Sequence, residues 1–229
     1  MSSTSIISII VAIINLLPVV IYFAKPGERE PVLRLLMIWL LIRFITEAVG
    51  IAAIINDMEP VAHVVGNCFS IIEIIMIIRM YQMKLDPSLK NPLYILMIAL
   101  VGIEIYQIAV TPGIFAFPIL SRMVFSVAVT LLAILYFIKL LKDLPAIHVY
   151  KVPMLWINVG FLVYFAGGFF LFIAKDYVVH MMENDFTFYW GYHNFIAVLS
   201  FILYSIALLQ GRLLPDVNNG SAAQQYDSE

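Results

Sequence analysis

Charged side chains are scarce in this chain of 229 residues. Only 12% of the residues are Asp, Glu, Lys or Arg, whereas roughly a quarter are charged in ordinary soluble domains. Hydrophobic residues make up 63%, and the mean hydropathy is +0.99. The 11 Pro and 11 Gly are spread along the chain, which excludes a low-complexity or collagen-like protein. The composition also excludes a soluble globular domain and indicates an integral membrane protein.

The sequence lacks residues that three known classes of membrane protein require. The single Cys cannot form an external disulfide, and the third hydrophobic run ends Ile78-Arg79-Met80-Tyr81, so the marks of G-protein-coupled receptors are absent. The last run has no Lys for a retinal Schiff base. Only His63 and His193 are suitably placed as ligands, whereas intramembrane zinc hydrolases need about three His. We therefore expect no metal site and no cofactor.

Hydrophobic runs of about 20 residues, the length that crosses a bilayer, are separated by breaks rich in Pro, Gly and charge. The runs are continuous rather than alternating, which excludes a transmembrane β-barrel. We expect residues 1–214 to form one transmembrane domain and residues 215–229 a short disordered cytoplasmic tail. The fold class predicted is all-α, an integral membrane bundle of seven transmembrane helices at Ser5–Ala24, Val32–Ile55, Val61–Met83, Pro92–Val110, Ile119–Leu141, Met154–Ala174 and Trp190–Gln210.

Positive charge is distributed very unevenly between the two sets of loops. Of the 13 Lys and Arg residues, all but Lys175, Arg43 and Arg122 fall in the odd-numbered loops and the tail. Cytoplasmic loops of membrane proteins carry the excess of Lys and Arg. The first run has no basic residue before it, so we do not expect a cleaved signal peptide. The pattern predicts an N-terminus outside and a cytoplasmic C-terminus.

Ionisable residues inside the hydrophobic runs are the candidates for function, because a buried charge in a bilayer is expensive unless it is paired or hydrated. Lipid would reject these polar side chains, so we expect them to face one another inside the bundle. Their depth, at about 1.5 Å per residue, places most of them toward the outer surface, around a polar pocket that opens outward. The candidate ligand-binding residues are Arg43, Glu47, Glu73, Glu104, Arg122, His193 and Asn194.

Two Arg against three Glu within the runs leave one negative charge without a counterpart. Either one Glu is protonated, or His63 or His193 is charged, or a cation or cationic ligand is bound. A purely structural role is the alternative for Arg43 and Glu73, which share a depth near mid-membrane, because buried Arg–Glu pairs often only specify how helices pack. His63 and Asn67 fit interhelical hydrogen bonds better than ligand binding.

Three stretches of the sequence carry a resemblance to known proteins: NCFSIIE at 67–73, WINVGFLVYF at 156–165, and 192–204, which begins Tyr-His-Asn. Together they resemble a group of bacterial seven-helix proteins that occur alone or as membrane sensor modules ahead of histidine kinases. The resemblance implies a bacterial inner-membrane location and a receptor-like or sensor role. With only a short tail after the last run, signalling is expected to require a separate cytoplasmic partner.

The sequence thus favours a receptor-like or sensor protein over two rivals. Its pocket would bind a small molecule or a lipid headgroup, and its partners would be membrane lipids, that ligand and a cytoplasmic signalling protein, with no nucleic acid. The first rival is a proton- or ion-coupled transporter, for which the Glu and His residues would form a relay. The second is a membrane enzyme that modifies lipid, and a non-enzymatic role is favoured over it.

Overall fold

The computed structural model describes residues 3–24, 29–110, 118–143, 146–181 and 187–210. The described residues are helical throughout their regular structure and contain no strand, which confirms the predicted all-α class. Two short 3₁₀ helices, Pro87–Leu89 and Ala146–Lys151, lie in connections. The predicted tail lies outside these residues. The α-helices are α1 (Ser3–Ala24), α2 (Pro31–Ile55), α3 (Glu59–Lys84), α4 (Lys90–Val110), α5 (Ile119–Asp143), α6 (Pro153–Met181) and α7 (Thr187–Gln210).

Six of these helices, α2 to α7, are long and apolar enough to cross a membrane. In α1 the apolar stretch that can be assessed, Ile13–Ala24, is shorter than a full span. Each predicted run falls within one helix, and the helices extend into the predicted break at 175–189, since α6 continues to Met181 and α7 begins at Thr187. Residues 175–181 include the charged Lys175 and Asp176 but no Pro or Gly. Charge alone does not stop a helix.

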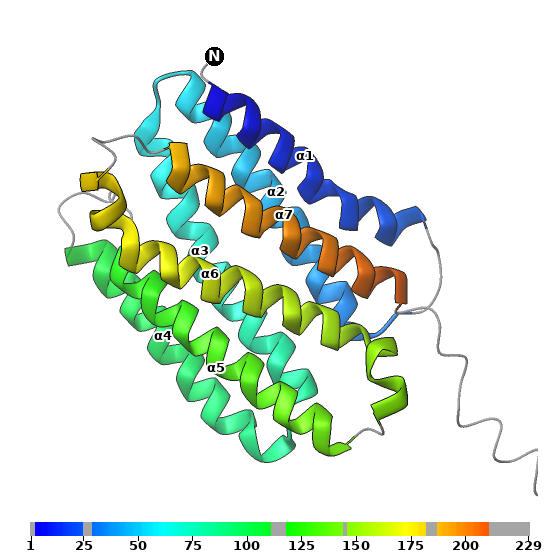
Figure 1. The fold of residues 1–229 in the computed structure, drawn as a ribbon. Coiled ribbons are helices and arrows are strands. Elements are labelled where there is room, and N and C mark those ends of the chain that lie inside the picture. Colours follow the sequence, from blue (N-terminus) through cyan, green and yellow to red (C-terminus); the bar gives the residue numbers. More distant parts are fainter. Residues whose placement is uncertain (1–2, 25–28, 111–117, 144–145, 182–186, 211–229) are drawn as a thin grey trace, which may run out of the picture.

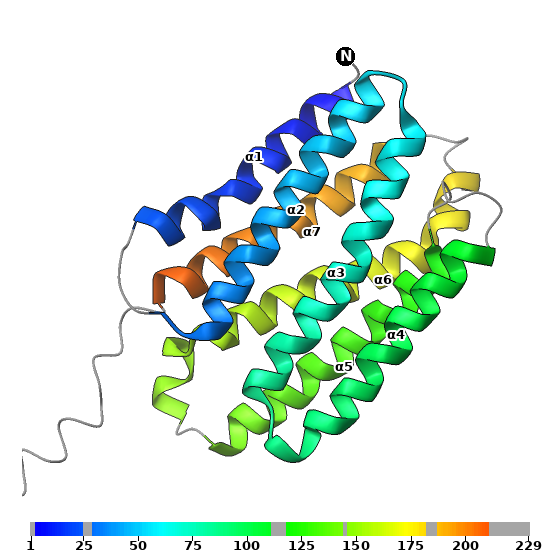
Figure 2. The same ribbon diagram turned by 180° about the vertical axis from the view of Figure 1, so that it is seen from behind.

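The helices form a closed, flattened ring in chain order (Figure 1). Each helix packs against the next, α7 packs against α1, and α3 also contacts α5. The two opposite views show α5, α6 and α7 in one layer and α2, α3 and α4 in the other, with α1 along the edge between α2 and α7 (Figure 2). Consecutive helices are antiparallel, so the ends of α2, α4 and α6 lie at the same end of the bundle as the beginnings of α3, α5 and α7.

This alternation divides the bundle into two halves. We call the part from the ends of α2, α4 and α6 to the level of Arg43, Glu73 and Tyr164 near the middle of the bundle the polar half, and the opposite part the packed half. Aromatic rings fill the packed half, and the largest, Trp39, Tyr81, Phe161 and Tyr204, are fully buried. The ring centres of Trp39 and Phe161 lie 5.7 Å apart, and those of Phe161 and Tyr204 5.6 Å apart, in edge-to-face contacts. These contacts add to the stabilisation from burial.

Ion pairs join the helices at the end of the packed half that is farthest from the polar half. Lys84 at the end of α3 pairs with Glu30 just before α2, and Lys139 of α5 pairs with Asp86 at 2.8 Å. The Nζ of Lys139 also donates a hydrogen bond to the backbone oxygen of Lys84. These exposed pairs contribute little stability individually, but they place charged side chains at one end of the bundle.

Candidate functional site

A cavity of about 260 Å³ lies in the polar half, among α2, α3, α5, α6 and α7. Five of the seven predicted ligand-binding residues line it, namely Arg43, Glu47, Glu73, Arg122 and His193. Its other polar side chains are Thr46, Ser126 and Tyr164. Apolar side chains form the rest of its wall, chiefly Phe69, Phe125, Phe165, Leu171 and Phe172.

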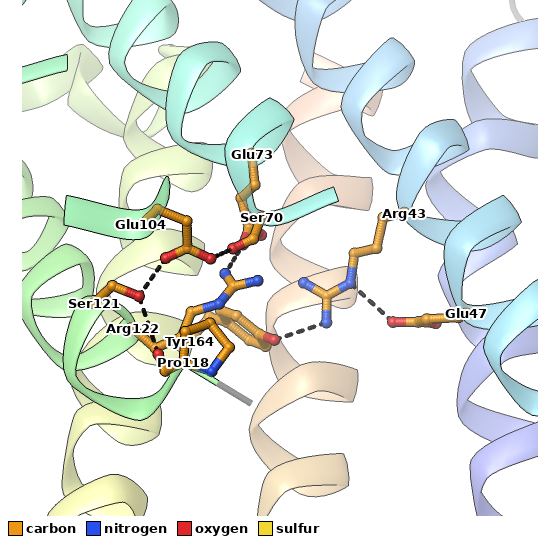
Figure 3. Close-up of polar contacts among 9 residues, drawn as sticks. All are labelled: Arg43, Glu47, Ser70, Glu73, Glu104, Pro118, Ser121, Arg122 and Tyr164. Carbon is orange, nitrogen blue, oxygen red and sulfur yellow. Dashed lines mark hydrogen bonds and ion pairs between the residues drawn. The ribbon is translucent and has the colours of Figure 1, made fainter. Parts of the chain in front are cut away.

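Arg43, near the middle of α2, is held by contacts on two of its three nitrogens. Its Nε donates to Oε1 of Glu47 at 3.0 Å, one turn along the same helix, and its Nη2 donates to the hydroxyl of Tyr164 at 2.9 Å (Figure 3). The guanidinium carbon also lies 4.5 Å from the centre of the Tyr164 ring and 5.2 Å from that of Phe201, distances at which a cation is attracted to the ring face. Arg43 is only 5% exposed, and its Nη1 has no hydrogen-bond partner among the described residues.

The second ion pair joins α5 to α3. Nη1 of Arg122 lies 2.7 Å from Oε2 of Glu73, and the Glu73 side chain is almost fully buried. The other carboxylate oxygen, Oε1 of Glu73, is buried without a hydrogen-bond partner in the described part of the chain. A pairing of Arg43 with Glu73, which their common depth suggested, is therefore replaced by two other pairs. Arg43 pairs with Glu47 on the same face of α2, and Arg122 pairs with Glu73 where α5 meets α3, so a shared depth does not decide which side chains pair.

Glu104 on α4 lies outside the cavity lining and is completely buried. The hydroxyls of Ser70 and Ser121 each donate a hydrogen bond to one of its two carboxylate oxygens (Figure 3). No Arg or Lys of the described residues forms an ion pair with it. Among the three Glu residues of the sequence count, Glu104 is therefore the one without an ion pair in the described structure, and it lies between α3, α4 and α5.

The remaining two candidates, His193 and Asn194, are neighbours on α7 with different surroundings. The His193 ring lies edge-to-face against Tyr164, with ring centres 6.0 Å apart, and contributes to the cavity wall. Asn194 is partly buried but lies outside the lining, since consecutive helical residues point about 100° apart.

Two residues of the site were missed in the sequence. Asn15 of α1 is completely buried and its Nδ2 donates to Oε2 of Glu47 at 3.4 Å, so α1 also supports the site. The signal was present, because Asn15 is the only amide in the first hydrophobic run. Tyr164 gave no comparable signal, since aromatic residues are common in membrane helices.

The packed half closes the cavity on the opposite side. There, the Tyr81 hydroxyl donates to Oδ1 of Asn158 at 2.8 Å, and Nδ2 of Asn158 donates to the backbone oxygen of Ala133 at 3.0 Å. These bonds connect α3, α5 and α6, and none of the three residues belongs to the cavity lining.

The arrangement places paired charges beside a cavity. Within the described ranges no group of three or more His, Cys, Asp or Glu is placed to hold a metal ion. The charged groups of the cavity are instead fixed by one another, which positions donors and acceptors for a ligand. No protein-family model, curated protein or solved structure matches the chain.

Proposed function

We propose that the chain is a seven-span membrane protein that binds a small molecule in the polar-half cavity and acts as a receptor or sensor. The observation that carries the proposal is the two Arg–Glu ion pairs on the cavity wall, each of which includes a buried atom without a partner in the described structure: Arg43 Nη1 and Glu73 Oε1. Charged groups inside a membrane protein are expensive and mark binding sites by default.

The proposed orientation has the polar half facing outward. Apart from Lys175 of α6, the Lys and Arg residues outside the spans, where the structure describes them, lie at the ends of the helices in the packed half, and such residues accumulate on the cytoplasmic side. With α1 counted as the seventh span, the N-terminus is then outside. The resemblance to bacterial sensor modules favours the inner membrane as its location.

Ligand binding would be transmitted through the helices that share the cavity. A ligand that partners Arg43 and Glu73 links α2 to α3, while their existing bonds already reach α5 and α6. If the bundle has two arrangements of these helices, the ligand increases the population of the arrangement that it contacts better. At the cytoplasmic end, a second pocket of about 320 Å³ beside Arg79 and Lys90 offers a basic surface for a separate signalling protein.

The test is to recover the natural ligand and to block its site. Gly168 lines the cavity, and a Cβ placed there meets no atom within 4 Å, so Gly168→Leu fills the space without a clash at Cβ. Gly102 on α4 is equally open but lies outside the cavity, so Gly102→Leu is the matched control. Untargeted mass spectrometry of small molecules bound to the purified proteins should find one that is retained by the wild type and Gly102→Leu and lost from Gly168→Leu. Equal amounts in all three would contradict the proposal.

Transport is the alternative function, and it can be tested with the purified protein in liposomes. A transporter needs a polar path through the packed half, where the rings of Trp39, Phe161 and Tyr204 are fully buried. We therefore expect no uptake of the recovered molecule, with or without a proton gradient. Uptake driven by the gradient would replace the sensor proposal with a transporter.

A further inference from the structure

Two residues of the cavity wall each carry an unsatisfied buried atom, and the two atoms are of opposite character. Arg43 Nη1 is a hydrogen-bond donor on a cation, and Glu73 Oε1 is an acceptor on an anion. Both atoms are buried without a partner among the described residues, on side chains more than nine-tenths buried. Leaving a buried polar atom unsatisfied is costly, and more so when the group is charged. A ligand that supplies one acceptor and one donor would remove both penalties.

The charge of the cavity restricts the ligand further. Arg43 and Arg122 are balanced by Glu47 and Glu73, so the wall is neutral overall. A ligand with a net charge would introduce a buried charge without a counterpart, which the low-dielectric interior disfavours. A neutral ligand with both a positive and a negative group satisfies the two atoms and keeps the balance.

The size and the wall of the cavity indicate the rest of the molecule. Its volume of about 260 Å³ is below the range of about 300–1,000 Å³ that is usual for drug-sized ligands. Phe69, Phe125, Phe165 and Phe172 line it beside the charges. The ligand is therefore small and has an apolar portion that can pack on aromatic rings.

We propose that the cavity binds a zwitterion, with its anionic group on Arg43 and its primary ammonium group on Glu73, and with an apolar remainder against the Phe side chains. This deepens the proposed function and depends on it. The chemistry can come from two sources: a free α-amino acid with an apolar side chain, or the headgroup of phosphatidylethanolamine. In both, ammonium and anion are a few bonds apart.

The first test uses the wild-type protein and three molecules of similar shape. Leucine has both charges, leucinamide only the ammonium group and 4-methylpentanoate only the carboxylate. Each missing charged hydrogen bond should weaken binding by about 10- to 100-fold, measured by calorimetry in a maltoside detergent. Leucinamide or 4-methylpentanoate binding as tightly as leucine would overturn the zwitterion proposal.

A second test asks whether the ligand is the lipid headgroup. It compares the melting temperature of the protein in nanodiscs of phosphatidylethanolamine with that in nanodiscs of phosphatidylglycerol, which lacks the ammonium group. A higher melting temperature in phosphatidylethanolamine for the wild type, lost in Gly168→Leu, assigns the site to the lipid headgroup. Tight leucine binding in detergent, also lost in Gly168→Leu, assigns it to a free amino acid. If neither leucine nor phosphatidylethanolamine has an effect, the proposal is wrong.

A charge-neutral double variant locates the ammonium site. Glu73→Gln with Arg122→Gln removes both charges of a pair and leaves an uncharged polar side chain at each position. It should bind leucine no better than 4-methylpentanoate, because the partner of the ammonium group is gone. Glu30→Gln with Lys84→Gln removes an ion pair at the other end of the bundle and should keep the full preference for leucine. Preference retained by the first double variant would contradict the assignment of Glu73.

The zwitterion can fail while the proposed function stands. If a co-purified molecule is lost from Gly168→Leu but carries a net charge, the cavity is a ligand site and the ligand class is wrong. If no molecule depends on Gly168, and leucine and phosphatidylethanolamine act equally on the wild type and Gly168→Leu, both proposals are wrong.

Discussion

The two halves of the bundle are built from the same helices but are stabilised by different interactions. In the packed half, fully buried rings of Trp39, Tyr81, Phe161 and Tyr204 fill the space between the layers. In the polar half, two Arg–Glu pairs and a buried carboxyl occupy the corresponding positions and leave a cavity. Close packing stabilises the first half. The second half gives up packing density to hold charges in fixed positions, which is typical of a binding site.

The largest effect is expected from breaking one ion pair of the polar half. Glu73→Ala leaves the Arg122 cation without its carboxylate partner, and removal of one member of a buried pair destabilises by about 3–5 kcal/mol. Replacing both, as Glu73→Leu with Arg122→Met, converts this region to an apolar one like the packed half and should recover most of the loss. Unfolding of the purified variants in detergent measures the difference.

Ligand binding separates stability from function in the same variants. The double variant should be folded but should no longer bind the zwitterion. A single Glu73→Ala variant as stable as the double variant would show that the pair is not buried in the way the structure describes.

A smaller effect is expected within α6, which passes through both halves. A Cβ at Gly160 would lie 2.4 Å from Cε1 of Tyr204, a ring that cannot shift because it packs on Trp39 and Phe161. Gly160→Ala should therefore destabilise the protein by about 1–3 kcal/mol, the usual range for overpacking. Gly168 lies two turns along the same helix, and a Cβ there meets no atom within 4 Å. Gly168→Ala should therefore not lower the melting temperature measurably. Equal losses at both positions would mean that α6 is packed alike in the two halves.

The sequence was sufficient for the helices and for the ionisable residues of the cavity wall. A hydrophobic run of about 20 residues is easy to recognise in a sequence, and a charged residue within it stands out. The cavity residues Arg43, Glu47, Glu73, Arg122 and His193 could therefore be identified without coordinates. The seven-span count and the orientation stay predictions.

Partner choice could not be predicted in the same way. Arg43 and Glu73 share a depth, but pairing depends on which faces of the helices meet, and a periodicity along one helix does not fix its rotation against the next. The same limit applies to Glu104, whose depth predicted the pocket but whose face points to Ser70 and Ser121. Tyr164 was not identified, because an aromatic residue in an apolar helix looks the same whether it packs or binds.

The smallest effect compares one hydroxyl in each half. Tyr81→Phe removes the hydrogen bond to Asn158 in the packed half, and interhelical hydrogen bonds in membrane proteins contribute about 0.6 kcal/mol on average. The variant should be slightly less stable and should bind leucine or phosphatidylethanolamine like the wild type. Tyr164→Phe removes the acceptor for Nη2 of Arg43, so the guanidinium gains a second unsatisfied nitrogen and can rotate. Its stability should fall somewhat more than that of Tyr81→Phe, because a buried charged donor loses its partner, and its ligand affinity should also change by more than that of Tyr81→Phe. Equal affinities for the two variants would mean that Tyr164 only packs, as Tyr81 does, and that Arg43 is held in place without it.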